Sequence, residues 1–200
     1  ATLLPASPWL QAAVQQQGGE PVFGGVLERG RSFQYLLYFV GKVHRSAAEG
    51  DSYSHGVRQR LFAQHVNRSD FYLRERPGAG ALELDKVRSS KFCLAQHGVG
   101  FGMRQFNAIA AGCVPLIIVV RPEDDREFGG TLEQVYEEVL PWDKFALRVP
   151  RSQLADLPRV LQEVSAAEHE AMLRAAACVW PRLFWLHAFG GDAHDTPLEP

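Results

Sequence analysis

Short apolar runs alternate with stretches of helical periodicity along most of this chain. Five of the apolar runs have the length and the flanking turn residues of buried strands. These predicted strands cover 33–40, 70–73, 91–95, 114–120 and 145–149. The predicted helices cover 56–66, 82–89, 103–111, 131–139, 152–164 and 166–180. Because strands and helices alternate at short spacing, we expect an α/β fold, with a Rossmann-like parallel sheet and helices on both of its faces.

The pattern weakens toward both ends of the chain. Residues 1–31 are mixed, with a short helix expected at most over 9–17, and we interpret them as a lead-in or as the remnant of a preceding domain. Residues 187–200 are rich in Gly, His, Asp and Pro, which is typical of a loose tail. One sheet domain is therefore expected over residues 32–186.

The composition narrows the class of protein. Apolar residues make up 46% of the 200 residues and charged residues 22%, as in ordinary globular domains. The net charge is −2, so the basic footprint of a nucleic-acid-binding protein is absent. The longest apolar stretch, 106–120, is interrupted by Asn107, Gly112 and Pro115, which argues against a membrane span. We expect any membrane anchor of the natural protein to lie outside this chain.

Three cysteines, Cys93, Cys113 and Cys178, lie within apolar stretches. Their odd number and the lack of a C-x-x-C spacing argue against a disulfide framework and against a zinc site. We therefore expect buried thiols that behave as small hydrophobic residues. Asn67-Arg68-Ser69 matches the acceptor motif for N-glycosylation, although such triplets often arise by chance.

A glycine-rich loop separates the third predicted strand from the helix that follows it. The loop contains Gly98 and Gly102, and Arg104 lies on the first turn of the helix. In parallel sheets, ligands bind outside the carboxyl ends of the strands, where backbone N–H groups of such loops suit a phosphate. The sequence therefore predicts an anion site here, bordered by Gly41 and Arg45 after the first strand. A plain flexible turn remains the alternative for the two glycines, and a surface position for Arg45.

The segment SSKFCLAQHGVGFGMRQFNAIAAGCVPLII resembles the signature of the exostosin-like glycosyltransferases. The resemblance continues on both sides, in YLLYFVGKVHR with GVRQRL and in LPWDKFALRVPRSQLADLPRVLQEVS. It covers residues 31–186 in order, and the combination of SKFCL with Gly-Cys-Val-Pro is fairly specific.

The resemblance implies the C-terminal, donor-binding domain of a GT-B glycosyltransferase. Such an enzyme would transfer a sugar from a UDP-sugar to a polysaccharide or glycoprotein acceptor, with inversion, without a metal and without a further cofactor. No Asp-x-Asp triplet occurs in the chain. The resemblance also implies a lumenal Golgi location, a membrane anchor in the full-length protein and possible oligomers with related transferases. Only about thirty residues precede the first strand, so the chain is expected to be a fragment or a truncated relative.

Individual positions follow from the match. Arg104 corresponds to the family's arginine for the donor diphosphate, and Gly98 and Gly102 would let the backbone approach the phosphates. Arg58 corresponds to a helix arginine that could reach the same group, and a solvated helix face is the equal alternative, because Val57 and Leu61 form the apolar face of its helix. Arg60 has the same solvated interpretation. Gly41 and Arg45 would border the donor.

Two site positions depart from the family's usual residues. Asn107 stands where a Glu or Asp normally accepts hydrogen bonds from the ribose hydroxyls, and an amide binds them less strongly than a carboxylate. Gln96 stands where the family usually has proline. A catalytic base cannot be assigned in this chain. The alternatives are therefore a non-catalytic nucleotide- or glycan-binding module with a decayed donor site, and an unrelated Rossmann-like nucleotide-binding enzyme.

Overall fold

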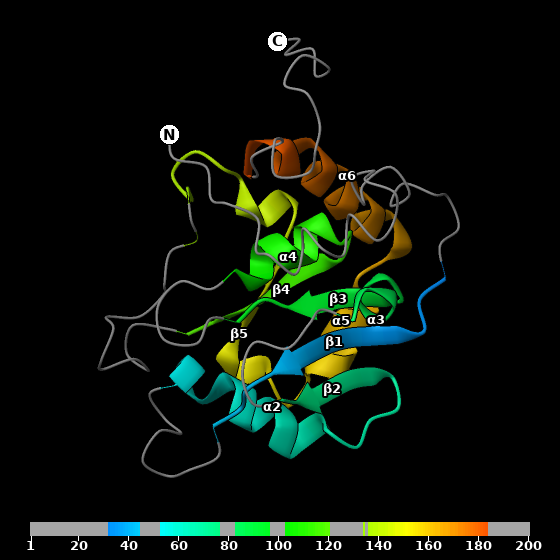
Figure 1. Cartoon of the computed structure of the whole chain (residues 1–200), viewed down its shortest axis with the longest axis vertical. Coiled ribbons are helices and arrows are strands. Elements are labelled where there is room, and N and C mark those ends of the chain that lie inside the picture. The colour runs from blue at the N-terminus through cyan, green and yellow to red at the C-terminus, as the bar shows by residue number, and fades with distance from the viewer. Residues whose placement is uncertain are drawn as a thin grey trace.

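Five parallel strands form one sheet in the order β2-β1-β3-β4-β5 (Figure 1). The structure, a computed structural model, describes residues 32–44, 53–76, 83–96, 103–120, 134 and 136–183. The strands are β1 Tyr35–Gly41, β2 Phe71–Glu75, β3 Ser90–Leu94, β4 Val114–Val119 and β5 Leu147–Pro150. The helices are α2 Val57–His65, α3 Leu84–Arg88, α4 Arg104–Ala110, α5 Leu157–Glu163 and α6 Ala166–Leu183, with 3-10 turns η2 Tyr53–Gly56, η4 Trp142–Lys144 and η5 Arg151–Gln153.

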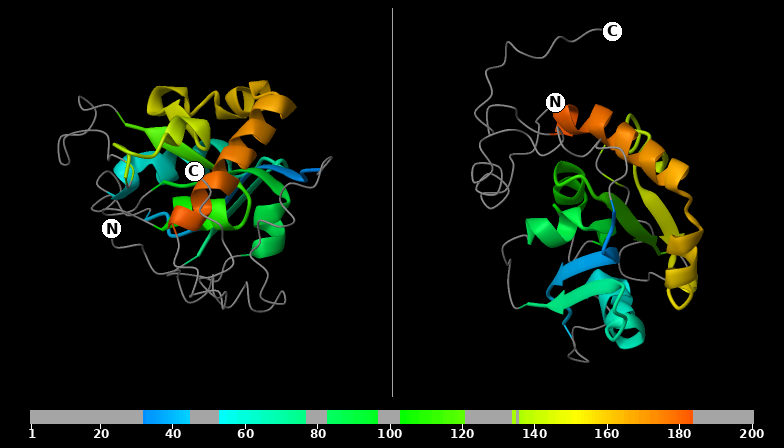
Figure 2. Two further views of the ribbon diagram at one scale, coloured as in Figure 1. Left: turned by 90° about the horizontal axis from the view of Figure 1, so that it is seen from above. Right: turned by 90° about the vertical axis from the view of Figure 1, so that its right-hand side faces the viewer.

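Helices cover both faces of the sheet, as predicted. In the right-hand view of Figure 2, α3 and α4 lie on one side and α5 lies on the other, and α6 runs from the α5 side toward α4, which it contacts. Alternate residues of β1 pack on opposite faces of the sheet, because successive side chains of a strand point to opposite faces. Leu37 and Phe39 belong to the larger buried cluster with α2 and α5, and Tyr38 and Val40 belong to the smaller cluster with α3 and α4. This double coverage explains why the strands read as continuous apolar runs.

The predicted helix over 131–139 is wrong in its described part. Tyr136 has a φ of 59°, a left-handed value that an α-helix cannot contain. Residues 136–139 form turns instead. The other predicted helices and all five strands are present with boundaries shifted by a few residues, except that the segment at 152–164 divides into η5 and α5. The predicted lead-in at 1–31 and the tail at 187–200 lie outside the described residues.

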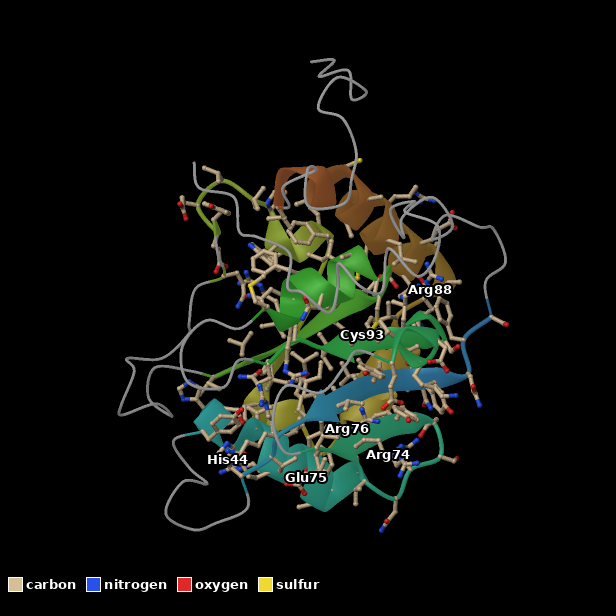
Figure 3. All side chains as sticks on the ribbon, viewed as in Figure 1. His44, Arg74, Glu75, Arg76, Arg88 and Cys93 are labelled. Atoms are coloured by element: carbon tan, nitrogen blue, oxygen red, sulfur yellow. A yellow bond between two sulfur atoms is a disulfide. The ribbon has the colours of Figure 1, made fainter. Side chains whose placement is uncertain are left out.

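The expectation of unpaired cysteine thiols is wrong for Cys93 and Cys113, which form a disulfide with an S–S distance of 2.05 Å. Figure 3 shows Cys93 near the middle of the molecule. The register of β3 and β4 places Cys93 opposite Pro115. The Cα atoms of Cys93 and Cys113 are 5.9 Å apart, a separation that a disulfide spans. Cys178, which was expected to be buried, is exposed on α6.

The longest described helix begins with a capping box. The Glu168 carboxylate accepts hydrogen bonds from the Ser165 backbone N–H and hydroxyl, at 2.8 and 2.7 Å. The Glu168 backbone N–H in turn donates to the Ser165 hydroxyl at 3.2 Å. These bonds satisfy N–H groups that the first turn of α6 would otherwise leave open. Among the described residues, no helix is both long and apolar enough to cross a membrane.

Candidate functional site

The candidate site lies where β1 and β3 end side by side. The chain reaches β3 only after visiting β2 on the other side of β1, so the order of the strands reverses at this point. Sheets of this order bind ligands at such a switch point, outside the carboxyl ends of the strands. Gly41 is the last residue of β1, Gln96 lies two residues beyond β3, and Arg104 is the first residue of α4.

The Arg104 side chain crosses from α4 to the end of β1. Its Nη1 donates a hydrogen bond to the Val40 carbonyl at 2.9 Å, and its guanidinium carbon lies 4.7 Å from the centroid of the Phe39 ring. A Cβ atom at Gly41 would lie 2.2 Å from Arg104 Nη2. The absence of a side chain at Gly41 therefore leaves the space that the guanidinium occupies, and the structure brings these two predicted residues together.

The Arg58 guanidinium reaches the same place from α2. Nη1 donates to the Lys42 carbonyl at 3.1 Å and to the Tyr53 hydroxyl at 2.7 Å, and Nη2 donates to the Gln96 carbonyl at 2.7 Å. The guanidinium carbon lies 5.2 Å from the centroid of the Phe39 ring. The buried Nε has no hydrogen-bond partner. Arg58 therefore links the segments after β1 and β3 and keeps one donor unused.

The interpretation of Arg58 as part of a solvated helix face is wrong. Only 3% of Arg58 is exposed, because α2 buries Val57, Leu61 and Phe62 together with it. The periodicity of the sequence indicates a narrower buried face than the real one, since a helix packed between a sheet and a turn covers adjacent positions as well. Arg60 is exposed, as predicted.

The two guanidinium groups impose an electrostatic cost on each other. Burial, and after it the positive charge of Arg104, lower the pKa of Arg58 to about 10. Burial also lowers the pKa of Arg104. Within the described residues, no carboxylate forms an ion pair with either arginine. Two like charges of this kind, one buried and one half-buried, are suited to an anion that accepts hydrogen bonds from both.

Tyr53, which sequence reasoning missed, supports Arg58 in two ways. Its hydroxyl accepts the Arg58 hydrogen bond, and its ring centroid lies 4.9 Å from the guanidinium carbon. Tyr53 opens η2, in which Ser54, His55 and Gly56 have left-handed φ values of 54°, 50° and 69°. Such strained backbone is typical of sites where surrounding contacts fix the conformation. No sequence motif marks Tyr53, so its contact with Arg58 is recognisable only in the folded structure.

Asn107 lies one turn after Arg104 on α4, and thus on the same side of that helix. It is 8% exposed, and its Oδ1 is buried without a hydrogen-bond partner. The side chain thus presents an unused acceptor, whereas Arg58 presents an unused donor. Gln96 is buried, and its backbone carbonyl accepts from Arg58. The remaining predicted site residues, Arg45, Gly98 and Gly102, lie outside the described residues.

No cluster of metal-binding side chains is evident among the described residues. They contain no group of three or more His, Cys, Asp or Glu side chains that could hold a metal ion. The candidate site instead contains cationic and neutral hydrogen-bond donors and one amide acceptor. These groups suit a phosphate-bearing organic ligand.

A parallel α/β sheet with a cationic candidate site at its switch point defines a Rossmann-like domain. The chain belongs to the exostosin GT47 domain family, whose model matches residues 27–164. The predicted family and fold class are thereby confirmed, and the alternative of an unrelated Rossmann-like enzyme is wrong.

Curated relatives agree with this family. A protein of Arabidopsis thaliana, named as a probable glucuronoxylan glucuronosyltransferase, is 27% identical over 140 residues, which are 68% of this chain and 27% of the relative. Exostosin-2 of Bos taurus is 26% identical over 99 residues, and that of Homo sapiens is 25% identical over 99 residues. These alignments cover 49% of this chain and 12% of each exostosin-2. The chain thus spans about a quarter or less of the length of these relatives.

Proposed function

We propose that this chain is the donor-binding part of a glycosyltransferase that uses a UDP-sugar. The observation that carries the proposal is a pair of arginines, the buried Arg58 and the half-buried Arg104, at the switch point of the sheet without a carboxylate partner among the described residues. Membership of the exostosin GT47 domain family supports the same class of reaction. The acceptor is a polysaccharide or a glycoprotein, and the transfer is inverting and independent of metal.

The chemistry of sugar transfer explains what two arginines contribute. When the glycosidic bond of the donor breaks, negative charge builds on the diphosphate that leaves. Cations already held in place stabilise this charge without reorganisation, and so lower the barrier. Arg104 is anchored on Val40 and Arg58 on Lys42, Tyr53 and Gln96, so both are held before a ligand arrives.

The unused groups fit the rest of a nucleotide. The Arg58 Nε is a donor suited to a phosphate oxygen, and the Asn107 Oδ1 is an acceptor suited to a ribose hydroxyl. Gly41, Arg45, Gly98 and Gly102 complete the proposed donor site. The disulfide of β3 supports the proposed lumenal Golgi location, because buried disulfides persist in oxidising compartments of the secretory pathway.

Titration calorimetry with UDP and UDP-sugars tests the proposal. The wild-type protein should bind UDP, and Arg104→Ala or Arg58→Ala should weaken binding by about 10- to 100-fold, as expected for the loss of one charged hydrogen-bonding group. Arg60→Ala is the matched control, because Arg60 is exposed on the same helix as Arg58 and should leave the affinity unchanged. Absence of heat at millimolar UDP for the wild-type protein would contradict the proposal.

A non-catalytic binding module is the second candidate, and the amide at Asn107 favours it. Asn107→Glu separates the two functions. If the site operates with an amide acceptor, a carboxylate buried at this position should weaken UDP binding. If the site has decayed from an acidic ancestor, the same change should strengthen UDP binding, because charged acceptors form stronger hydrogen bonds.

A further inference from the structure

The connection between α2 and β2 carries a chemical motif that sugar transfer does not use. In Figure 1, β1 and β2 point to the left, and this connection lies at the right-hand end of the sheet. It contains Asn67-Arg68-Ser69, which matches the Asn-x-Ser acceptor motif for N-glycosylation. Asn67 and Ser69 are both exposed. Asn67 is one of only two asparagines in the chain.

The connection keeps its shape without the Asn67 side chain. The backbone N–H of Arg68 donates to the His65 carbonyl at 3.1 Å, and that of Phe71 donates to the Arg68 carbonyl at 3.4 Å. Arg68 also forms an ion pair with Asp70 at 2.8 Å. The Asn67 amide takes part in none of these bonds, so a substituent on its nitrogen displaces none of them.

The disulfide indicates that the chain passes through the compartment where this modification occurs. Cys93 and Cys113 are 4% and 1% exposed, so their disulfide is buried in the core and does not lie on the surface. Such disulfides form in oxidising compartments, above all the lumen of the secretory pathway. N-glycans are added in the same lumen. This reasoning does not depend on glycosyl transfer by the chain itself.

A glycan at Asn67 would leave the candidate donor site open. The connection precedes β2 at the amino edge of the sheet, whereas the arginine pair lies at the carboxyl edge. β2 has five residues, so at a rise of about 3.3 Å per residue the two edges are about 17 Å apart. The neighbouring Val66 is 43% exposed, and β2 is an edge strand. A glycan here would cover both features, which otherwise favour association between chains.

We propose that Asn67 is N-glycosylated. The donor is an oligosaccharide carried on a lipid diphosphate. The Asn67 Nδ2 forms a bond to the anomeric carbon of the oligosaccharide, and the bond from that carbon to the diphosphate oxygen breaks. The lipid diphosphate leaves with the electron pair, and the amide nitrogen loses one proton to the glycosylating enzyme. The hydroxyl of Ser69 is the second element of the acceptor motif.

The test uses the full-length natural protein purified from the secretory compartments of a eukaryotic host, with the glycan state read on one peptide. Trypsin releases residues 61–68, which contain Asn67 and no other asparagine. Treatment with the amidase that removes N-glycans should convert Asn67 to Asp, a change that mass spectrometry detects. An unmodified Asn67 peptide from protein of these compartments would overturn the proposal. Because the peptide comes from the wild-type protein, this readout does not depend on the folding of a variant.

Three variants identify the motif as the cause. Asn67→Gln and Ser69→Ala should each abolish the mobility shift that this treatment produces at Asn67, whereas Ser69→Thr should retain it, because threonine also supplies the hydroxyl. A shift attributable to this peptide that survives Ser69→Ala would overturn the proposal. UDP binding should be unchanged in Asn67→Gln. A failure of the donor-site proposal would therefore change the UDP affinity measured by calorimetry and not the glycan state of the Asn67 peptide.

Discussion

At the scale of single residues, Gly41 and Arg104 share one small space. The backbone of Gly41 is not in the left-handed region, which among the described glycines only Gly56 and Gly112 adopt. Glycine is therefore required at position 41 for the room that it leaves and not for its backbone freedom.

Gly41→Ala should consequently impair binding more than stability. The added methyl group would force the Arg104 guanidinium, the end of a flexible side chain, away from the Val40 carbonyl. We expect a loss of UDP affinity of about 10-fold or more, corresponding to about 1.5 kcal/mol for a hydrogen bond to a charged group. Calorimetry and denaturation on the same variant check both quantities.

Gly112→Ala is the contrasting control, because Gly112 has a φ of 72°. We expect it to lower the free energy of unfolding by about 1–2 kcal/mol, the cost of a left-handed conformation for a residue with a Cβ. Equal UDP affinity of Gly41→Ala and the wild-type protein would show that Arg104 does not contact the ligand.

At the scale of elements, the disulfide encloses the segment that carries most of the site. Cys93 and Cys113 are 20 residues apart, and α4 with Arg104 and Asn107 lies between them. α4 has only seven residues and no side-chain cap, so its own hydrogen bonds give it little independent stability. Its orientation therefore depends on the bridge and on burial of Phe106 and Ile109.

Replacing both bridged cysteines with alanine should have two effects. The free energy of unfolding should fall by about 3 kcal/mol, the typical contribution of a disulfide that closes a loop of this length. UDP affinity should fall as well, because α4 is then less firmly placed. Chemical denaturation and calorimetry measure the two effects. Cys178→Ser is the control, since Cys178 is exposed. Full UDP affinity in the folded double variant would show that packing alone places α4.

The capping box of α6 gives a prediction about pH. Hydrogen bonds from the Ser165 hydroxyl and backbone hold the pKa of Glu168 below its ordinary value. A lowered pKa in the folded state means that the bonds stabilise the fold above the ordinary glutamate pKa of about 4.3, and that this stabilisation is lost as the pH falls through the lower folded value. Ser165→Ala should therefore lower the free energy of unfolding at neutral pH, and by less in acid.

Denaturation of Ser165→Ala at several pH values checks this dependence. The matched control is Ser152→Ala, because Ser152 is also exposed but no cap hydrogen bond involves it. A destabilisation by Ser165→Ala that stays constant down to about pH 3, below the ordinary glutamate pKa, would mean that Glu168 contributes nothing through its charge.

At the scale of the whole molecule, the sequence predicts the layers well and the contacts between them poorly. The strands are apolar on both faces, so their runs are visible without any knowledge of neighbours. The pairing of Cys93 with Cys113 depends on strand register, and the burial of Arg58 depends on how α2 packs. Neither quantity is encoded in local periodicity. Arg104 and Gly41 could be predicted as site residues because the family motif marks them.

The proposed ligand should stabilise the whole domain. A ligand that binds the folded state alone adds about 2.7 kcal/mol to the free energy of unfolding when its concentration is about 100 times the dissociation constant. Thermal denaturation of the wild-type protein should therefore shift upward with UDP concentration. The Arg104→Ala variant should need at least about ten times more UDP for the same shift. Equal shifts for both proteins would mean that UDP binds elsewhere.

The hydrogen bonds of the arginine pair also make the site a reporter of folding. Arg58 donates a hydrogen bond to the Gln96 carbonyl, 38 residues away in the sequence. Arg104 donates one to the Val40 carbonyl, 64 residues away. Contacts between such distant segments form late, because long loops must close before the contacts exist. In refolding experiments, ligand binding should appear only after helical circular dichroism has recovered. The site thus exists only in chains whose sheet has assembled from β1 through β3.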